Sequence, residues 1–264
     1  MKKYFVIGNP IDHSLSPKLH NYWMEINNVK ATYEKRKLVL NEIQYLINDI
    51  KEKKISGINV TVPFKKKIID FLDTLSDEAK ITQSVNTIYV DNNKVVGHNT
   101  DIDGFENSIK KIDYKLTDKK ACILGTGGVV PSIIFALQRM GVGEIFVCGR
   151  TKSKAENLKS LFKNLEILNW GELPNFDIII NATSLGLKKD DKIDIDFSKV
   201  GQNKLFYDVI YNPKETDFLK KGKELGNLTE NGKMMFILQA QKSFQKWHNI
   251  LPKVDKEVER LLDD

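Results

Sequence analysis

The chain has 264 residues, of which 41% are hydrophobic and 29% charged, a composition typical of a globular protein of about two domains and too apolar for a disordered one. The net charge of +6 comes mainly from lysines interleaved with acidic residues, and arginines are too scarce for the bidentate contacts of a nucleic-acid-binding protein. The uncharged stretch of residues 121–137 is shorter than a membrane span, and the first residues do not form a signal peptide. We therefore expect a cytoplasmic protein that binds neither nucleic acid nor membrane.

In the N-terminal half, short β-like runs alternate with amphipathic stretches. The sequence predicts strands at residues 4–8, 32–39, 57–60 and 87–90 and helices at residues 17–26 and 41–53. Turn-rich segments at residues 97–101 and 227–232 are candidate linkers.

The C-terminal half continues the alternation. The predicted strands are residues 120–124, 144–148, 177–181 and 205–209, and the predicted helices are residues 129–140, 153–162 and 234–247. Such alternation indicates an α/β fold in which βαβ units build parallel sheets.

Cysteine and histidine usage limits the chemistry. Cys122 and Cys148 lie in apolar, strand-like surroundings, so we expect buried free thiols and no disulfide framework. The four histidines have no metal-ligand spacing, and no acidic cluster suggests a metal site.

A glycine-rich turn, Gly125-Thr126-Gly127-Gly128, follows a predicted strand and opens a predicted helix. Glycines allow the backbone to approach a pyrophosphate, and the N–H groups at the helix start bind negative charge. The simpler alternative is a turn that only connects the strand to the helix.

The end of the next strand indicates which nucleotide binds. An acidic residue there would accept the ribose hydroxyls of NAD, whereas this chain has Arg150, Thr151 and Lys154. These cations and this hydroxyl suit a 2′-phosphate, so the sequence favours NADP over NAD.

Small polar residues follow strand ends of the N-terminal half. Each has an ordinary structural explanation: Ser16 before Pro17 can cap a helix, Lys65 can be a solvated lysine of a triplet, and Asp101 can begin a helix. Together, their hydroxyls and amides suit a polyhydroxylated ring, and a lone Lys–Asp pair suits proton transfer beside a carbonyl.

Segments spread over nearly the whole chain resemble, in order, the motifs of the shikimate dehydrogenase family, in its biosynthetic NADP-dependent branch. The segments are residues 8–17, 59–65, 84–87, 97–105, 125–128, 181–186, 208–213 and 232–240, followed by Phe244 and Trp247. The resemblance implies reversible NADPH-dependent reduction of 3-dehydroshikimate to shikimate, a step of aromatic amino-acid biosynthesis.

The resemblance also implies roles for individual residues. Lys65 and Asp101 match the catalytic pair, and Ser14 and Ser16 match the pair that holds the substrate carboxylate. The residues matched to the rest of the substrate are Asn59, Thr61, Asn86, Asp101, Tyr211 and Gln239. The residues matched to NADP are Gly125, Thr126, Gly127 and Gly128 at the pyrophosphate, Arg150, Thr151 and Lys154 at the 2′-phosphate, and Thr183, Ser184, Gly232 and Met235 toward the nicotinamide.

The family architecture implies two domains with the site in the cleft between them. Residues 1–101 and 235–264 would bind the substrate, and residues 102–234 would form a Rossmann-like NADP-binding domain, in a monomer or a homodimer. The chain departs from the family pattern at Gly149, where asparagine is usual, and at residues 129–131, where small residues are usual. Both departures touch the cofactor site.

Two alternatives remain open from the sequence. One is a quinate/shikimate dehydrogenase that uses NAD, which the cations after the second strand of the cofactor domain disfavour. The other is a non-catalytic NADP-responsive binding module, which would not need Lys65 and Asp101 beside the complete hydroxyl-binding set.

Overall fold

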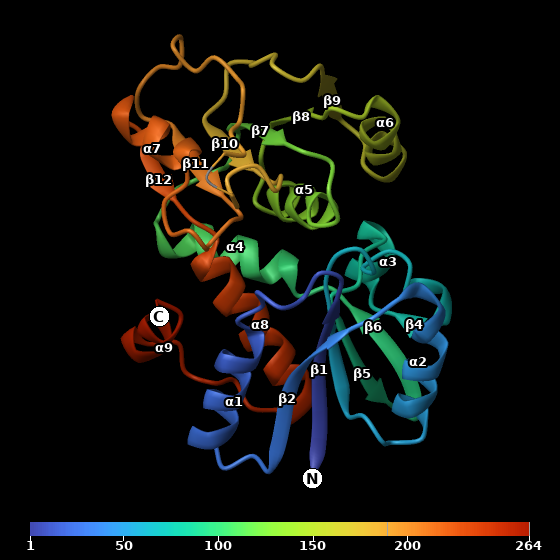
Figure 1. The fold of residues 1–264 in the computed structure, drawn as a ribbon. Helices are drawn as coiled ribbons and strands as arrows, with labels where there is room; N and C mark the ends of the chain where they lie inside the picture. The colour runs from blue at the N-terminus through green and yellow to red at the C-terminus, as the bar shows by residue number, and fades with distance from the viewer. Residues whose placement is uncertain (189, 264) are drawn as a thin grey trace. The chain divides into compact units, whose positions relative to one another are not determined.

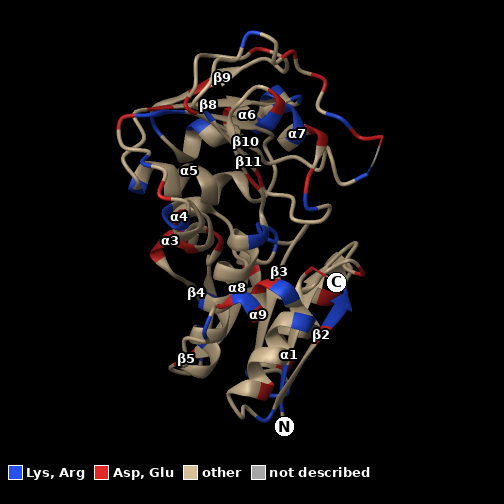
Figure 2. Ribbon diagram, turned by 90° about the vertical axis from the view of Figure 1, so that its left-hand side faces the viewer, with Lys and Arg blue, Asp and Glu red and all other residues tan. Residues whose placement is uncertain are grey.

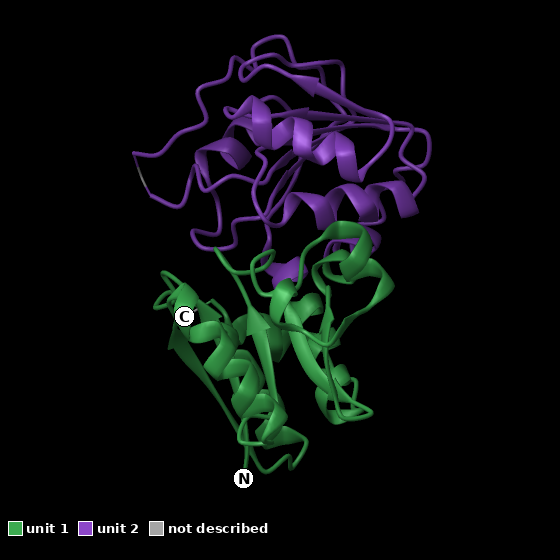
Figure 3. Cartoon of the chain, turned by 90° about the vertical axis from the view of Figure 1, so that its right-hand side faces the viewer, with its two compact units in different colours: residues 1–104, 237–264 green, residues 105–236 purple. Residues whose placement is uncertain are grey.

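The computed structural model describes residues 1–188 and 190–263, and the chain divides into two compact units (Figure 3). Unit 1 comprises residues 1–104 and 237–264, and unit 2 comprises residues 105–236. Both divisions fall inside helices, α4 (Asp101–Lys111) and α8 (Lys233–His248).

The two turn-rich segments predicted as linkers, residues 97–101 and 227–232, lie just before these divisions and are partly strand. Residues 97–98 end the strand β6 (Lys94–His98), and the segment 227–232 contains the strand β12 (Leu228–Glu230). Asparagine and glycine are turn signals, but here they stand at strand ends, where the polypeptide turns into the next helix.

Unit 1 contains a six-stranded sheet in the order β2-β1-β3-β5-β6-β4 (Figure 1). Besides β6, its strands are β1 (Lys2–Gly8), β2 (Ala31–Lys37), β3 (Gly57–Val60), β4 (Thr74–Leu75) and β5 (Thr87–Asp91). The first three strands of the chain are parallel, with β1 between β2 and β3. This edge of the sheet agrees with the βαβ pattern of the sequence.

The expectation of a wholly parallel sheet is wrong at β5, which runs antiparallel to both β3 and β6. Only Asn92 and Asn93 separate β5 from β6, and both have positive φ. A two-residue loop of this conformation joins antiparallel neighbours, and asparagine tolerates it better than most residues.

Helices cover both faces of the unit 1 sheet. The helices are α1 (Ser16–Ile26), α2 (Ile43–Lys51), α3 (Asp77–Thr82) and α9 (Lys256–Leu261), with 3₁₀ turns η1 (Leu40–Glu42) and η2 (Ile69–Phe71) and the C-terminal part of α8. The buried side of α2 joins a core that includes Ile7 and Ile58. Because side chains alternate along a strand, Tyr4 faces the other side, where its ring packs on Trp247 of α8.

Unit 2 contains a six-stranded parallel sheet in the order β12-β11-β10-β7-β8-β9. Besides β12, its strands are β7 (Lys120–Leu124), β8 (Glu144–Cys148), β9 (Leu165–Leu168), β10 (Ile178–Asn181) and β11 (Leu205–Asp208), and its further helices are α5 (Val130–Arg139), α6 (Lys152–Leu161) and α7 (Asp217–Glu224). This strand order is that of a dinucleotide-binding Rossmann fold. The order reverses between β7 and β10, so the ends of these strands flank the crevice where such folds bind ligands.

The two cysteines lie in the core of unit 2, as predicted. Both are buried and free, and their Sγ atoms are 3.7 Å apart on the neighbouring strands β7 and β8. Phe176, Ile179 and Phe206 pack in the same cluster.

Basic and acidic residues are interspersed along both units (Figure 2). In the described part of the chain, no helix has the length and apolar character needed to span a bilayer. Among the same residues, no group of three or more His, Cys, Asp and Glu side chains could hold a metal ion.

Candidate functional site

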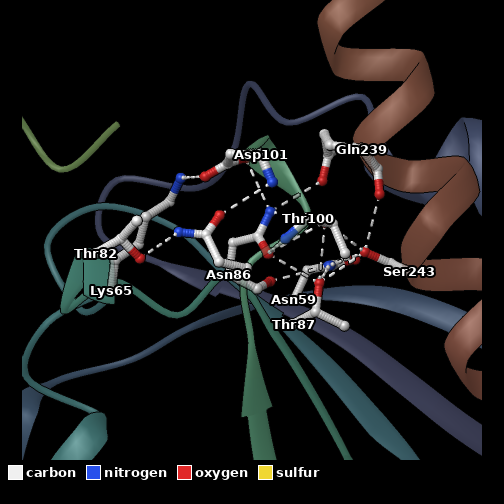
Figure 4. Close-up of polar contacts among 10 residues, drawn as sticks. Asn59, Lys65, Thr82, Asn86, Thr87, Thr100, Asp101, Gln239 and Ser243 are labelled. Atoms are coloured by element: carbon white, nitrogen blue, oxygen red, sulfur yellow. Dashed lines mark hydrogen bonds and ion pairs between the residues drawn. The ribbon is translucent and has the colours of Figure 1, made fainter. Parts of the chain in front are cut away.

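Lys65 and Asp101 form a partly buried ion pair in unit 1 (Figure 4). Lys65 Nζ donates to Asp101 Oδ2 at 2.5 Å, and the two side chains are 13% and 8% exposed. Lys66 and Lys67, by contrast, are exposed. Asp101 is the first residue of α4, where the helix dipole favours a carboxylate. Lys65 is thus partly buried in an ion pair, whereas the two lysines that follow it are exposed to solvent.

Asn86 holds the other oxygen of this carboxylate. Its Nδ2 donates to Asp101 Oδ1 at 2.8 Å, and its Oδ1 accepts from the backbone N–H of Thr100 at 2.8 Å. The same Nδ2 lies 3.4 Å from Gln239 Oε1 of α8. Asp101 is therefore held on one side by a cation and on the other by an amide.

Asn59 lies behind Asn86, with its polar atoms engaged inside the protein. Its Nδ2 donates to the backbone oxygen of Asn86 at 3.0 Å, and its Oδ1 accepts from the Tyr33 hydroxyl at 2.7 Å. Burial raises the pKa of Tyr33 well above its usual range, and a hydrogen bond with Ser16 opposes part of that shift. Tyr33 therefore connects the Ser16 segment to Asn59.

Three buried hydroxyls, of Thr87, Thr100 and Ser243, complete this network (Figure 4). Ser243 Oγ lies 2.7 Å from Thr87 Oγ1 and 3.2 Å from Thr100 Oγ1. Ser243 is not among the functional candidates predicted from the sequence. Its signal is its spacing, because it follows Gln239 by one helical turn of α8 and its hydroxyl lies 3.1 Å from the Gln239 backbone oxygen.

Ser14 lies between β1 and α1, Ser16 is the first residue of α1, and their hydroxyls are 3.2 Å apart. Ser16 is buried, whereas Ser14 is partly exposed. Thr61, also partly exposed, follows β3, and its N–H donates to the Ile7 oxygen of β1. These side chains therefore come from the ends of adjacent parallel strands, where open α/β sheets collect ligands.

The predicted glycine turn of unit 2 joins β7 to α5. Gly125 has a φ of +114°, and a Cβ on it would lie 3.0 Å from the Ala182 oxygen, so only glycine fits without strain. Gly127 and Gly128 are exposed. Val129, the N-cap of α5, makes no side-chain cap, and Pro131 lies in the first turn. The backbone shape and an uncapped helix start fit the pyrophosphate of a dinucleotide.

Exposed cations follow β8 at the same edge of the sheet. Arg150, Thr151 and Lys154 are all exposed, and the Arg150 guanidinium lies over the Trp170 ring at 5.8 Å from its centre. Within residues 148–154 there is no acidic side chain. These positions fit an additional phosphate on the ribose.

Gly149, where the resemblance predicts asparagine, lies close to the glycine turn. A Cβ at this position would lie 2.6 Å from Cγ2 of Thr126 in the glycine turn. The β-branched Thr126 and the absent side chain at residue 149 therefore fit one another. The turn and the loop after β8 pack closely because of this pair.

Buried polar groups connect the ends of β10 and β11. Asp208 is fully buried and accepts from Thr216 Oγ1 at 2.6 Å, Asn181 Nδ2 at 3.0 Å and the N–H of Ile210 at 3.0 Å. Asn181 Oδ1 in turn accepts from Thr183 Oγ1 at 2.7 Å. Burial raises the pKa of Asp208 to about 6, although its hydrogen bonds oppose that shift.

The remaining predicted cofactor residues also lie in unit 2. Ser184 is exposed beside the partly exposed Thr183. Gly232 is buried and donates its N–H to the Ile210 oxygen, and Met235 is 6% exposed. Tyr211, predicted to contact the substrate, belongs to unit 2, where its ring stacks on Phe236 at 4.6 Å.

Two family models match the chain. The model described as the shikimate dehydrogenase substrate binding domain matches residues 6–88, and the model described as shikimate / quinate 5-dehydrogenase matches residues 107–215. The first match falls in unit 1 and the second in unit 2.

Curated and solved relatives extend the similarity over the full length. The chain is 58% identical over 264 residues to a protein of Pelagibacter ubique named shikimate dehydrogenase (NADP(+)), and both chains are covered completely. It resembles the crystal structure of shikimate dehydrogenase from Aquifex aeolicus with a TM-score of 0.92 and 36% identity, over 100% of this chain and 98% of that one. The Thermus thermophilus shikimate 5-dehydrogenase, solved in complex with NADP(H) and shikimate, gives a TM-score of 0.91 and 28% identity, over 100% and 99%.

Proposed function

Because the chain belongs to the shikimate dehydrogenase family, we propose that its reaction takes place at the Lys65–Asp101 pair of unit 1. The protein is an NADP-dependent oxidoreductase that interconverts 3-dehydroshikimate and shikimate. The observation that supports the site is the short ion pair between two side chains that are 13% and 8% exposed, in a segment where the neighbouring lysines are solvated.

Lys65 acts on the C3 oxygen of the substrate. NADPH, when bound, supplies the hydride, and negative charge then develops on that oxygen. The ammonium group of Lys65 stabilises the charge and donates a proton, and Asp101 orients Lys65 through their ion pair. In the opposite direction, Lys65 accepts the proton of the C3 hydroxyl.

The polar side chains of unit 1 bind the rest of the substrate. Ser14 and Ser16 bind its carboxylate, and Thr61, Asn86 and Gln239 bind the ring hydroxyls, with Asp101. Hydroxyls and amides at the ends of β1, β3 and β6 support this assignment, because they present donors and acceptors at one edge of the sheet. Asn59 belongs to this set through its hydrogen bond to Asn86. Tyr211 of unit 2 supplies a further substrate contact.

Unit 2 binds NADP. The glycine turn and the start of α5 hold the pyrophosphate, and Arg150, Thr151 and Lys154 hold the 2′-phosphate. Thr183, Ser184, Gly232 and Met235 border the nicotinamide end. The chain functions in the cytoplasm as a monomer or a homodimer, which subcellular fractionation and light scattering would test.

The decisive experiment compares Lys65→Ala with Lys66→Ala in a spectrophotometric assay of NADPH. Loss of a general acid and base lowers kcat by roughly 10²–10⁴-fold. The KM for shikimate stays within several-fold, because the serines and amides still bind the ring. Lys66→Ala is the matched control and should have wild-type turnover, and equal turnover of the two variants would refute the role of Lys65.

The same assay measures the preference for shikimate over quinate. Quinate carries an additional tertiary hydroxyl beside its carboxylate, and a pocket fitted to the unsaturated ring carbon would desolvate that hydroxyl without a partner. This costs roughly 1–3 kcal/mol, or about 5- to 150-fold in kcat/KM. Comparable efficiency with both compounds would instead indicate a quinate/shikimate dehydrogenase.

A further inference from the structure

The three hydroxyls of Thr87, Thr100 and Ser243 form a buried cluster beneath the proposed catalytic pair (Figure 4). Each hydroxyl has two or more partners within the cluster or on the neighbouring asparagines. Thr87 begins β5, Thr100 precedes α4, and Ser243 lies on α8. The cluster therefore ties three elements together at one point of unit 1.

The orientations of the two asparagine amides follow from partners that can play only one role. The Thr100 N–H can only donate, so it must face Asn86 Oδ1, and Asn86 Nδ2 then faces the Asp101 carboxylate. The backbone oxygen of Asn86 can only accept, so it must face Asn59 Nδ2. The hydroxyls lie between these two amides.

The hydrogen atoms of the cluster can be assigned in one direction. Asn59 Nδ2 has two hydrogens: one faces the Asn86 backbone oxygen, and the other can donate to Ser243 Oγ at 3.0 Å. The Ser243 hydroxyl can then donate to Thr87 Oγ1 at 2.7 Å, and the hydroxyls of Thr87 and Thr100 can donate to Asn86 Oδ1 at 3.0 and 3.1 Å. Donors that converge on Oδ1 polarise the amide, which strengthens donation from its Nδ2 to Asp101.

We propose that Thr87 and Ser243 are positioning residues for the reaction, because their hydroxyls fix and polarise the Asn86 amide that holds Asp101 against Lys65. This inference rests on the proposed role of the Lys65–Asp101 pair. Neither residue contacts the reacting atoms. Their effect reaches Lys65 through Asn86 and Asp101.

The test measures kcat and KM for shikimate oxidation in Thr87→Val, Thr87→Ser and Ser243→Ala. Valine keeps the shape of threonine and removes the hydroxyl, so we expect kcat to fall about tenfold while KM changes less than about threefold. Thr87→Ser restores the hydroxyl and should restore most of kcat. Ser243→Ala, one step farther from Asn86, should lower kcat about threefold.

Ser108→Ala is the matched control for Ser243→Ala. Ser108 is also a buried helical serine whose hydroxyl lies near a backbone oxygen of the preceding turn, but its other partner is Tyr207 in unit 2. This variant should lose thermal stability without loss of kcat. A wild-type kcat in both Thr87→Val and Ser243→Ala would overturn the proposal, as would equal losses of kcat in Ser243→Ala and Ser108→Ala.

A double-mutant comparison separates this proposal from the function on which it rests. If Thr87 acts through Lys65, Thr87→Val should not lower further the residual rate of Lys65→Ala, measured at high enzyme concentration. An additional tenfold loss in that background would show that Thr87 acts elsewhere and would overturn the proposal. A normal rate in Lys65→Ala alone would instead refute the proposed function. If Thr87→Val does not fold, Ser243→Ala in the same background gives the same distinction.

Discussion

The candidate sites of the two units are built by different means. In unit 1, the site consists of side chains that bond to one another, so that Lys65, Asp101 and Asn86 are held before any ligand arrives. In unit 2, the corresponding edge consists of a backbone turn, an uncapped helix start and exposed cations. In unit 1, removal of one hydrogen-bonding group should therefore lower kcat. In unit 2, changes of backbone shape and surface charge should instead weaken cofactor binding.

The strongest test of this contrast is Gly125→Ala. An alanine at a φ of +114°, with its Cβ against the Ala182 oxygen, must displace the turn. Strain and misplacement should raise the KM for NADP by at least about 100-fold. Gly141→Ala is the control, since Gly141 also has positive φ but its Cβ would meet only ordinary contacts. An unchanged KM for NADP in Gly125→Ala would show that this backbone turn does not bind the cofactor.

Arg150→Ala tests the surface charge of unit 2. A charge-assisted contact with phosphate contributes about 1.5–3 kcal/mol, so the KM for NADP should rise about 10- to 150-fold. The KM for NAD, which lacks the 2′-phosphate, should change less than about twofold. The control for net charge is Lys159→Ala, which removes another exposed cation, in the last turn of α6. Equal losses with both cofactors would place the 2′-phosphate elsewhere.

One buried titratable group in each unit should also change the free energy of unfolding in mild acid, and the two changes should have opposite signs. His20 of unit 1 is fully buried among aromatic rings, and desolvation lowers its pKa to about 3. The unfolded chain takes up a proton at this residue below about pH 6.5, whereas the folded chain does not, so stability is lost as the pH falls. Burial raises the pKa of Asp208 to about 6. As the pH falls, the folded chain therefore binds a proton at this residue before the unfolded chain does, and the free energy of unfolding increases.

Urea denaturation of variants at about pH 7 and about pH 5 measures these contributions. Between these pH values, His20 should lower the free energy of unfolding by about 2 kcal/mol, and His20→Gln should abolish this decrease. Asp208 should raise the free energy of unfolding by about 1 kcal/mol, and Asp208→Asn should abolish this increase. The pH dependence of the free energy of unfolding should therefore change in opposite directions in the two variants. A change of the same sign in both would contradict the assignment of charge states.

Local signals in the sequence predict much of this structure. The predicted strand of residues 120–124 has the same bounds as β7, and the glycines that follow it form the expected turn before a helix. The polar residues at strand ends are also found where the sequence places them, because parallel strands bring their carboxyl ends to one edge. The lysine triplet shows the limit, since only the fold separates Lys65 from the exposed Lys66 and Lys67.

Long-range contacts account for what the sequence did not reveal. Ser243 stands between Lys242 and Phe244 as an ordinary polar residue of a helix, and its partner Thr87 is 156 residues away. Asn59 is predicted as a ligand of the ring, and only the structure reveals that its amide is already bonded to Tyr33 and to the backbone of Asn86. Hydrogen-bond partners of this kind depend on packing, which periodicity does not encode.

The divided course of unit 1 has a consequence for biosynthesis. Residues 1–104 leave the ribosome first, but the helix that carries Gln239 and Ser243 follows residues 105–236, whose synthesis takes on the order of ten seconds. Until then, Gly57 lacks the indole of Trp247 that packs against it, and the Ile88 oxygen lacks its indole N–H donor. The nascent N-terminal segment must therefore wait with an uncovered sheet face, while unit 2, continuous in sequence, can fold as soon as it emerges.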